Sequence, residues 1–167
     1  MKQEFIDIVD DNNNFVRKVT WKEMSKGALL HKSIGVLVFN KKGELFVHKR
    51  AKNLVLYPGE YDMKIGGIVK SGESYEGAAK RELAEEIGAK NTKLEPLFSL
   101  RIRSKESNVN ERTFKCVWDG KIKTDKKEIE SGKFVSIKDA KKLYNAGKLC
   151  LSGEKALEKY LKLKIKK

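Results

Sequence analysis

The stretch from Gly67 to Ala89, GIVKSGESYEGAAKRELAEEIGA, constrains this chain more than any other part of it. Its first glycines predict the close of a strand, and Ser71-Gly72 predicts a turn. Ser74 is well placed as a helix N-cap, because its hydroxyl can accept an amide proton of the first turn. From Tyr75 to Ile87 apolar residues recur every four positions, as on one face of a helix. The stretch therefore predicts a strand end, a loop and about three turns of helix that Gly88 closes.

The predicted helix carries several carboxylates on one side. Glu85 and Glu86 lie three and four positions after Glu82, so all three project from one side of the helix. Like charges at this spacing repel by roughly 0.2–0.5 kcal/mol per pair on an isolated helix. A divalent cation would offset that repulsion, and Mg²⁺ commonly takes one or two carboxylates together with water and phosphate oxygens. The alternative is a solvated helix face with Lys80 and Arg81 as partners.

The spacing of the charged residues and glycines resembles the Nudix box. The positions that match are Gly67, then after five residues Glu73, after seven more Arg81-Glu82-Leu83, then Glu85-Glu86 and Gly88. Only Ala89 is unusual, since the family more often has a larger aliphatic residue there. On this resemblance, which is very specific, the chain is identified as a member of the Nudix superfamily with its box at residues 67–89.

The resemblance implies an α/β fold, a sandwich of helices around a mixed β-sheet. It also implies a Mg²⁺-dependent hydrolase, with Mn²⁺ as an alternative cofactor, in which water attacks one phosphorus of a diphosphate linked to a moiety X. Carried over by position, Glu82 and Glu86 are the main metal ligands, with Glu85 as a further ligand and the carbonyl of Gly67 nearby. The resemblance assigns Glu73 and Arg81 to orienting the loop and the carboxylates. A cation on the diphosphate would offset developing charge and ease deprotonation of water.

A wider part of the chain looks like one branch of this superfamily. Residues 5–52, followed by 57–62, are similar to isopentenyl-diphosphate isomerase and its hydrolase-like relatives. In that branch an arginine that ends the second core strand contacts diphosphate, and Arg50 matches it. Lys49 or Lys52 would assist Arg50 in binding substrate, or would simply form an exposed basic strand end.

Departures from the isomerase favour hydrolysis. Gly66 stands where the isomerase has its catalytic cysteine, and Ile68 stands where it has a histidine. Without a thiol or an imidazole there, protonation of an alkene has no evident donor. His31 matches a metal-binding histidine of the isomerase, but its companions are missing and a structural role is the better interpretation. The isomerase-like enzyme is therefore kept as the alternative to a hydrolase.

The general base is expected outside the box, as in many Nudix hydrolases. Glu128, just before a predicted strand at 134–137, is the first candidate and Glu130 the second. A box glutamate, Glu82 or Glu85, could serve instead, and Glu128 could equally be an exposed carboxylate that balances two lysines.

The residues of the box do not specify the chemical identity of the X group. Nucleotide-linked diphosphates are our first hypothesis, followed by prenyl diphosphates and other phospho-metabolites. The basic residues that would shape this choice, unless they form a solvated strand face, are Arg101, Arg103, Lys105 and Arg112.

Length and composition indicate the number of domains and the cellular setting of the chain. A chain of 167 residues suits one domain, with a hairpin and short helix in residues 1–30 and the core in residues 31–167. No run of ~18 apolar residues predicts a membrane span, and no signal peptide is recognisable. Cys116 and Cys150 lack metal-ligand spacing, so we expect small buried residues and a reduced, cytoplasmic setting.

The formal net charge of +14 suggests a third functional hypothesis beside the hydrolase and the isomerase-like enzyme. This hypothesis is an RNA-binding or RNA-end-processing protein. Residues 138–167 hold ten lysines against three acids. Because aromatic residues do not interleave with these lysines as in a stacking surface, a solvated helix face is the favoured interpretation. A homodimer is compatible with the resemblance, since many relatives dimerise.

Periodicity and turn residues place the other elements. The expected strands are 5–9, 15–19, 34–39, 44–50, 61–65, 94–104, 112–118 and 134–137, and the expected helices are a short one after Thr20, then 139–145 and 154–164.

Overall fold

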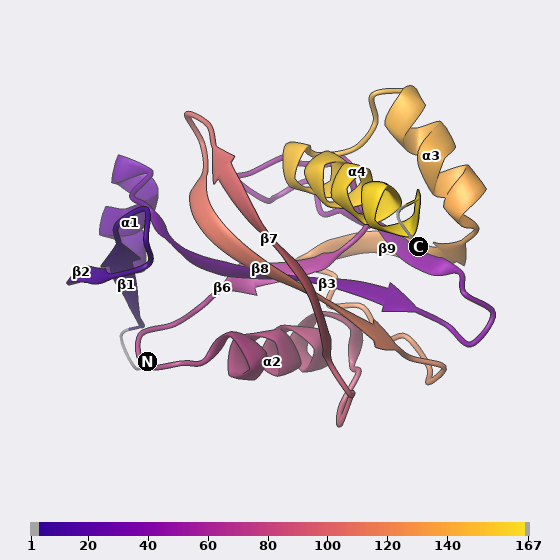
Figure 1. Cartoon of the computed structure of the whole chain (residues 1–167), viewed down its shortest axis with the longest axis horizontal. Helices are drawn as coiled ribbons and strands as arrows, with labels where there is room; N and C mark the ends of the chain where they lie inside the picture. The colour runs from indigo at the N-terminus through magenta and orange to yellow at the C-terminus, as the bar shows by residue number, and fades with distance from the viewer. Residues whose placement is uncertain (1–3, 166–167) are drawn as a thin grey trace.

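The computed structural model describes residues 4–165, which form a mixed sheet with helices on both of its faces (Figure 1). In chain order the elements are β1 (Phe5–Val9), β2 (Phe15–Thr20), α1 (Trp21–Gly27), β3 (His31–Phe39), β4 (Leu45–Arg50), β5 (Tyr61–Asp62), β6 (Ile65–Ile68), α2 (Tyr75–Ile87), β7 (Glu95–Arg103), β8 (Asn108–Val117), β9 (Ile129–Val135), α3 (Ile137–Asn145) and α4 (Leu151–Ile165). This arrangement confirms the predicted α/β fold with a mixed sheet.

β3 is the strand around which the sheet is built. Along one edge it pairs in parallel with β8, from His31 opposite Val109 to Phe39 opposite Val117. Along the other it pairs antiparallel with β6, and its last residue meets β4. A strand with neighbours on both edges and helices over both faces has no solvated side, which explains its nearly continuous apolar sequence. Every residue of β3 except Lys32 is buried.

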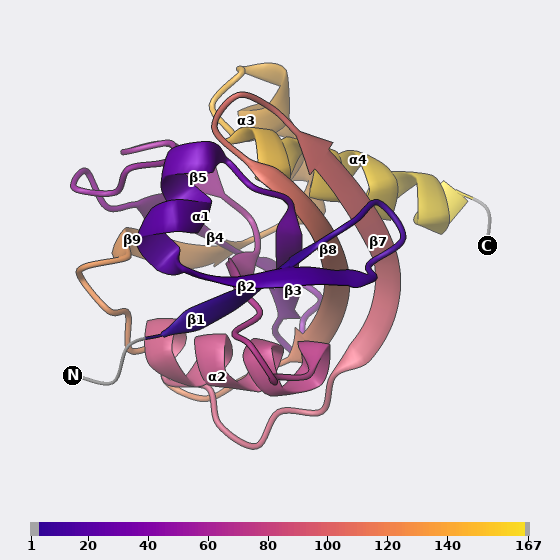
Figure 2. The ribbon, with the colours of Figure 1, turned by 90° about the vertical axis from the view of Figure 1, so that its left-hand side faces the viewer.

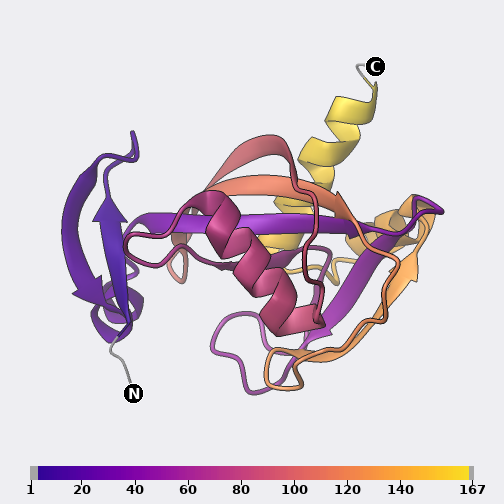
Figure 3. The same ribbon diagram turned by 90° about the horizontal axis from the view of Figure 1, so that it is seen from below.

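Alternate residues of β3 enter two different hydrophobic layers. Ile34 and Val36 pack with Leu83 and Ile87 of α2 on one face. Leu37 and Phe39 pack with α4 on the other face, where Phe39 lies against the ring of Tyr160 with centroids 5.4 Å apart. Seen from below, α2 lies across the sheet on the face opposite α4 (Figure 3). The sheet therefore separates the helix of the box from the C-terminal helices.

The N-terminal hairpin and helix stand at one end of this sandwich, at the left in Figure 1, and face the viewer in Figure 2. β1 pairs with β2 and touches β3 where Ile8 lies opposite His31. The predicted short helix after Thr20 begins with a capping box, in which Thr20 accepts from the amide of Glu23 and the Glu23 carboxylate accepts from the amide of Thr20. The amide of Ser71 donates to the carbonyl of Phe5 at 2.9 Å, so the hairpin is attached to the loop before α2.

The expected strand at 61–65 is in fact two short strands. β5 pairs with β4, whereas β6 pairs with β3. Between them, Asp62 Oδ1 accepts from the backbone amides of Met63 and Lys64, and this local turn interrupts the ladder. The glycines that were expected to close a strand instead lie inside β6.

The boundary between the last strand and α3 also differs from the prediction. β9 begins at Ile129, five residues before the predicted start, because its polar residues pair with β4 despite their low strand propensity. Ser136 then caps α3 by accepting from the amide of Asp139 at 3.1 Å, so Ile137 begins a helix and does not extend the strand.

Two further expectations concern the cysteines and the membrane. Cys116 and Cys150 are both buried with free thiols, as predicted. Among residues 4–165, no helix has the length and apolarity that a membrane span requires.

Candidate active site

The loop and helix of the box have the local geometry that the sequence predicts. Ser74 Oγ accepts from the amide of Gly77 at 3.0 Å, which begins α2. Gly88 ends the helix with a φ of 73°, a left-handed conformation that glycine adopts without strain. Its amide donates to the carbonyl of Leu83. Both ends of α2 are therefore held by residues adjacent to it in the sequence.

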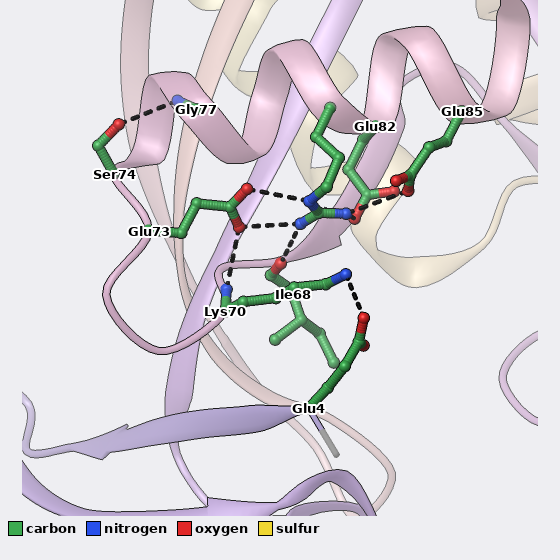
Figure 4. Close-up of polar contacts among 9 residues, drawn as sticks. Glu4, Ile68, Lys70, Glu73, Ser74, Gly77, Glu82 and Glu85 are labelled. Atoms are coloured by element: carbon green, nitrogen blue, oxygen red, sulfur yellow. Dashed lines mark hydrogen bonds and ion pairs between the residues drawn. The ribbon is translucent and has the colours of Figure 1, made fainter. Parts of the chain in front are cut away.

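Arg81 connects the loop to the helix, and its partners Ile68, Glu73, Glu82 and Glu85 are labelled in Figure 4. Its guanidinium makes a two-pronged contact with Glu73, from Nε to Oε1 at 2.9 Å and from Nη2 to Oε2 at 3.0 Å. Nη2 also donates to the carbonyl of Ile68 at 3.0 Å. Although partial burial opposes its charge, the hydrogen bonds from Arg81 and from the amide of Lys70 hold the pKa of Glu73 below its ordinary value. The loop is thus clamped against α2 by charged hydrogen bonds, which are stronger than neutral ones.

Gly67 provides room for the carboxylate of Glu82. A Cβ at position 67 would lie 2.1 Å from Glu82 Oε1 and 2.6 Å from its Cγ, closer than atoms can approach. Glu82 therefore lies directly against the backbone of β6, with its side chain only 14% exposed. No residue larger than glycine at position 67 is compatible with this position of Glu82.

The carboxylates of α2 differ in their surroundings. Arg81 Nη1 donates to Glu82 and, at 3.2 Å, to Glu85, whose side chain is 57% exposed. Glu86 is buried, and among residues 4–165 its carboxylate has no hydrogen bond or ion pair. Burial, followed by the negative charges of Glu82 and Glu128, raises the pKa of Glu86 well above its ordinary value. Glu86 is thus a buried acid whose charge no cation among the described residues neutralises by direct contact.

A cleft of about 580 Å³ lies in front of these carboxylates. Its floor is β6, and Arg50, at the end of β4, lines the same cleft. Arg50 Nε donates to the carbonyl of Leu56 at 3.1 Å, which orients the guanidinium. The charged residues that line the cleft are Glu4, Arg50, Lys70, Arg81, Glu82, Glu85, Glu86, Asp125 and Glu128. The structure therefore brings the predicted carboxylates, Arg50 and the first candidate base to one place.

Glu128 reaches the cleft on a loop that is anchored at both of its ends. The amide of Asp125 donates to the carbonyl of Glu86 at 2.8 Å, and the amide of Ala51 donates to the carbonyl of Glu128 at 2.9 Å. The amide of Glu128 donates to the carbonyl of Asp125 in a tight turn, so both acids line the cleft. Our sequence reasoning missed Asp125, although its position three residues before Glu128 could have indicated this turn.

Lys49 and Glu130 lie elsewhere. The Lys49 ammonium pairs with the Glu130 carboxylate at 3.2 Å, and neither residue lines the cleft. Successive side chains of a strand point to opposite faces, so Lys49 is directed away from the face that Arg50 occupies. Lys52, the other lysine expected to assist, does not line the cleft either.

The basic residues that were expected to shape the X pocket also lie outside the cleft. Arg101 donates to the carbonyl of Asp11, and Arg103 pairs with the carboxylate of Asp11 at 2.8 Å. Arg112 lies over the ring of Tyr75, 5.2 Å from its centroid. Lys105, like these arginines, is absent from the lining of the cleft. The arginines therefore link the β7–β8 hairpin to the N-terminal turn and α2.

The donor set suits Mg²⁺ chemically. Hard carboxylate oxygens are the ligands that this ion prefers, and the unpaired Glu86 supplies one beside Glu82. Within the described range no three His, Cys, Asp or Glu side chains form a ready ligand set, because Glu82 and Glu85 turn toward Arg81. The guanidinium thus holds two of the candidate ligands while Glu86 is left unpaired.

The chain is similar to several known proteins. The model of the NUDIX domain matches residues 29–152. An uncharacterized Nudix hydrolase of Pseudomonas aeruginosa is 28% identical over 95% of this chain and 94% of its own length. An uncharacterized Nudix hydrolase of Streptomyces coelicolor is 40% identical over 86 residues, which span 52% of this chain and only 48% of that relative.

Solved structures show the same fold. A crystal structure from Deinococcus radiodurans superposes with a TM-score of 0.81 at 20% identity and covers 93% of this chain and 98% of that one. A MutT protein from Methanosarcina mazei superposes with a TM-score of 0.70 at 22% identity, over 81% of this chain and 95% of that one.

Proposed function

This chain belongs to the Nudix hydrolase family, and from that premise we propose that it is a Mg²⁺-dependent hydrolase that cleaves a diphosphate linked to a small-molecule group X. The observation that carries this proposal is the buried and unpaired Glu86 beside Glu82 and Glu128, in a cleft that Arg50 also lines. An unpaired carboxylate in a cleft can bind a divalent cation, and a neighbouring arginine can donate hydrogen bonds to phosphate oxygens.

Each charged group of the cleft has a role in this proposal. Glu82, Glu85 and Glu86 would hold Mg²⁺, or Mn²⁺ in its place. The chemistry that the ion supplies when bound is charge neutralisation at the diphosphate and a lower pKa for water. Arg50 binds the diphosphate oxygens. The two hydrogen bonds between Arg81 and Glu73 hold the loop in place against α2.

Glu128 is the general base in this scheme. It lies close enough to Glu86 to raise the pKa of that acid, and its loop is anchored to α2 and to the residue after β4. Water adds to one phosphorus as its proton passes to Glu128, and the bridging phosphorus–oxygen bond breaks. A carboxylate within reach of the attacking water contributes roughly 10²–10⁴-fold as general base.

The proposal places this chain in the branch of the superfamily that includes isopentenyl-diphosphate isomerase. It does not include isomerisation as an activity of this chain. β6 carries Gly66 and Ile68 at the positions of the isomerase cysteine and histidine, and both cysteines of this chain are buried elsewhere. A hydrolase needs neither group, whereas proton addition to an alkene needs a donor.

The first test is release of phosphate or nucleotide from a panel of diphosphates with Mg²⁺ or Mn²⁺. The panel holds nucleoside triphosphates, nucleotide sugars, ADP-ribose, dinucleoside polyphosphates, prenyl diphosphates and capped RNA. We expect metal-dependent turnover of at least one member. Glu86→Gln should lower kcat by roughly 100-fold or more, because loss of a metal ligand removes several kcal/mol of charge stabilisation.

Glu76→Gln is the matched control, since Glu76 is an exposed glutamate in the first turn of the same helix. It should keep kcat within about twofold, as surface substitutions usually do. Absence of turnover on every member of the panel by the folded wild-type protein would overturn the proposal.

A further inference from the structure

A second cavity, of about 230 Å³, adjoins the carboxylate cleft. Gly66, Gly67 and Ile68 of β6 line both spaces, and so do Arg50 at the end of β4 and Trp21 of α1. A molecule with its diphosphate at Arg50 can therefore extend its other end past β6 into this cavity. We call it the X cavity.

The X cavity combines apolar walls with a charged floor. Met24, Leu56 and Val109 are among its apolar lining residues. Lys64 and Glu111 also line it, with Lys64 Nζ and Glu111 Oε2 3.0 Å apart and their side chains only 5% and 2% exposed. An ion pair this deep is costly to desolvate and is poor evidence of a purely stabilising role.

The backbone around this pair is shaped to admit it. A Cβ on Gly35 would lie 2.6 Å from Glu111 Oε1 and 2.8 Å from Lys64 Cδ. A Cβ on Gly66 would lie 3.1 Å from Lys64 Nζ. Two neighbouring strands thus have glycine where any side chain would crowd the pair, and β6 brings the Lys64 ammonium close to the floor of the carboxylate cleft.

The polar groups of the X cavity have unused hydrogen-bonding capacity. Of the three N–H donors of Lys64, the contacts within residues 4–165 occupy one, which bonds Glu111. The Ser33 hydroxyl also belongs to the lining, and it is buried without a hydrogen-bond partner in the same part of the chain. His31 uses Nδ1 on the carbonyl of Leu29 at 2.7 Å, and its burial lowers the pKa of the ring, which leaves Nε2 as an acceptor.

The charges of the floor select against an anion. Lys64 is paired with Glu111 and is also influenced by the charge of Asp62, and both acids line the X cavity. Burial opposes the charge of Lys64, but these two acids outweigh it and raise the pKa of its ammonium. The whole lining holds three acids, Asp62, Glu106 and Glu111, against Arg50 and Lys64, so a second anionic group would meet excess negative charge. An uncharged group with donors and acceptors would use the free hydrogen-bonding positions. A hydrocarbon chain would fit the walls but would leave the two remaining N–H donors of Lys64 and the Ser33 hydroxyl without hydrogen-bond partners.

We propose that Lys64 and Glu111 are the specificity-determining pair of this hydrolase, and that they bind a compact, uncharged, hydrogen-bonding X group such as a sugar or a heterocycle and reject a prenyl chain. This inference rests on the proposed function. It narrows the substrate to diphosphates whose X group presents an acceptor to Lys64 and a donor to Glu111 or His31.

The test replaces both charges at once, by Lys64→Met/Glu111→Leu. Removing one partner would leave a buried charge alone and threaten folding, whereas apolar residues of similar size commonly preserve stability. Isopentenyl diphosphate, whose X group is a hydrocarbon, is compared with a nucleotide sugar and a nucleoside triphosphate, whose X groups are uncharged and polar. We expect the variant to raise KM for the preferred polar substrate by roughly 10–100-fold with kcat within about threefold, because the site loses hydrogen bonds to X and not to the reacting phosphorus.

The matched control is Lys115→Met/Glu95→Leu, which removes a partly exposed ion pair between β7 and β8 that lines neither space. It should leave KM and kcat within about twofold, as removal of surface ion pairs usually does. Thermal unfolding of both variants checks that the fold is intact. An unchanged KM in the Lys64/Glu111 variant, or a wild-type preference for isopentenyl diphosphate, would overturn the inference while the hydrolase proposal stood.

Binding of a non-hydrolysable methylene analogue of the nucleoside triphosphate, measured by calorimetry, separates this inference from the proposed function. Wild-type binding that the double variant weakens at least tenfold supports the pair even if no substrate is turned over. Equal binding by both proteins, or none by the wild type to any polar analogue, counts against the pair regardless of turnover.

Discussion

Gly67 determines where the Glu82 carboxylate can lie. The space that a side chain at position 67 would occupy holds Glu82 Oε1, Cδ and Cγ. A glycine at this point of β6 is therefore required by a neighbour from another element and not by its own backbone conformation. Residues that serve a site in this way cannot be exchanged even when the strand itself would accept a larger residue.

Gly67→Ala tests this dependence. The new methyl group must displace Glu82, so we expect at least a tenfold loss of kcat with a stability loss of roughly 1–3 kcal/mol. In a Glu82→Ala background the same change should cost little further activity, because the clashing side chain is gone. Kinetics of the two single variants and the double variant measure this coupling. Additive losses would show that Gly67 acts independently of Glu82.

At the scale of the element, the loop before α2 and the helix itself form one unit. Glu73 is eight positions from Arg81, yet its carboxylate and that guanidinium make two hydrogen bonds across the loop. A third bond from Arg81 to the carbonyl of Ile68 extends the unit to β6. The helix that presents the carboxylates is thus fixed to the strand that forms the floor of the cleft.

Glu73→Gln should lower stability by about 1–2 kcal/mol at pH 7, because it removes a charge-assisted contact that is partly screened by solvent. The folded-state pKa of Glu73 is depressed below the ordinary value of 4.5. Its contribution is therefore fully present above about pH 4.5 and is lost as the pH falls through the lower folded-state pKa. Urea unfolding of wild type and variant from pH 7 to pH 3 measures it, with Glu76→Gln as control. A difference between the two proteins that stayed constant down to pH 3 would contradict this assignment.

At the scale of the whole molecule, distant segments meet at the cleft and the X cavity. Trp21 comes from α1, Arg50 from β4, Glu82 from α2 and Glu128 from the loop before β9. The loops at residues 51–60 and 119–128 are joined by a hydrogen bond from the amide of Ala51 to the carbonyl of Glu128. The N-terminal segment, which lies at the left end of the sheet in Figure 1, thus contributes to the site through Ile6 of β1 and Trp21 of α1.

The formal net charge of +14 is also a property of the whole molecule, and it bears on the binding of polyanions such as RNA. We expect RNA binding by this protein to be weak, independent of sequence and steeply salt-dependent, since it would rest on contacts between lysines and phosphates. Changing the exposed Lys141 and Lys162 to Glu lowers the net charge by four. This variant should lose RNA binding at 50 mM salt while hydrolysis of the small substrate stays within about twofold. Filter binding and the phosphate-release assay measure the two properties. RNA binding that persisted in the variant at physiological salt would favour a dedicated RNA site.

The sequence alone determined the features that depend on neighbours along the chain. The Ser74 cap, the helix from Tyr75 to Ile87 and its end at Gly88 follow from helical periodicity and capping chemistry, which act over a few residues. The apolar residues 34–39 of β3 were likewise sufficient to predict a strand there. Where side-chain hydrogen bonds compete with the ladder, as at Asp62, or where tertiary pairing outweighs propensity, as in β9, the predicted boundaries failed.

Only the tertiary structure decided which distant residues share the site. Lys64 meets Glu111 because β3 pairs with β6 on one edge and with β8 on the other, which places both side chains on one face over Gly35. Arg50 is included and Lys49 excluded by the direction in which β4 presents alternate side chains. Strand register and loop packing are set by contacts between parts of the chain that are far apart in sequence. The spacing of residues along the chain therefore cannot predict them.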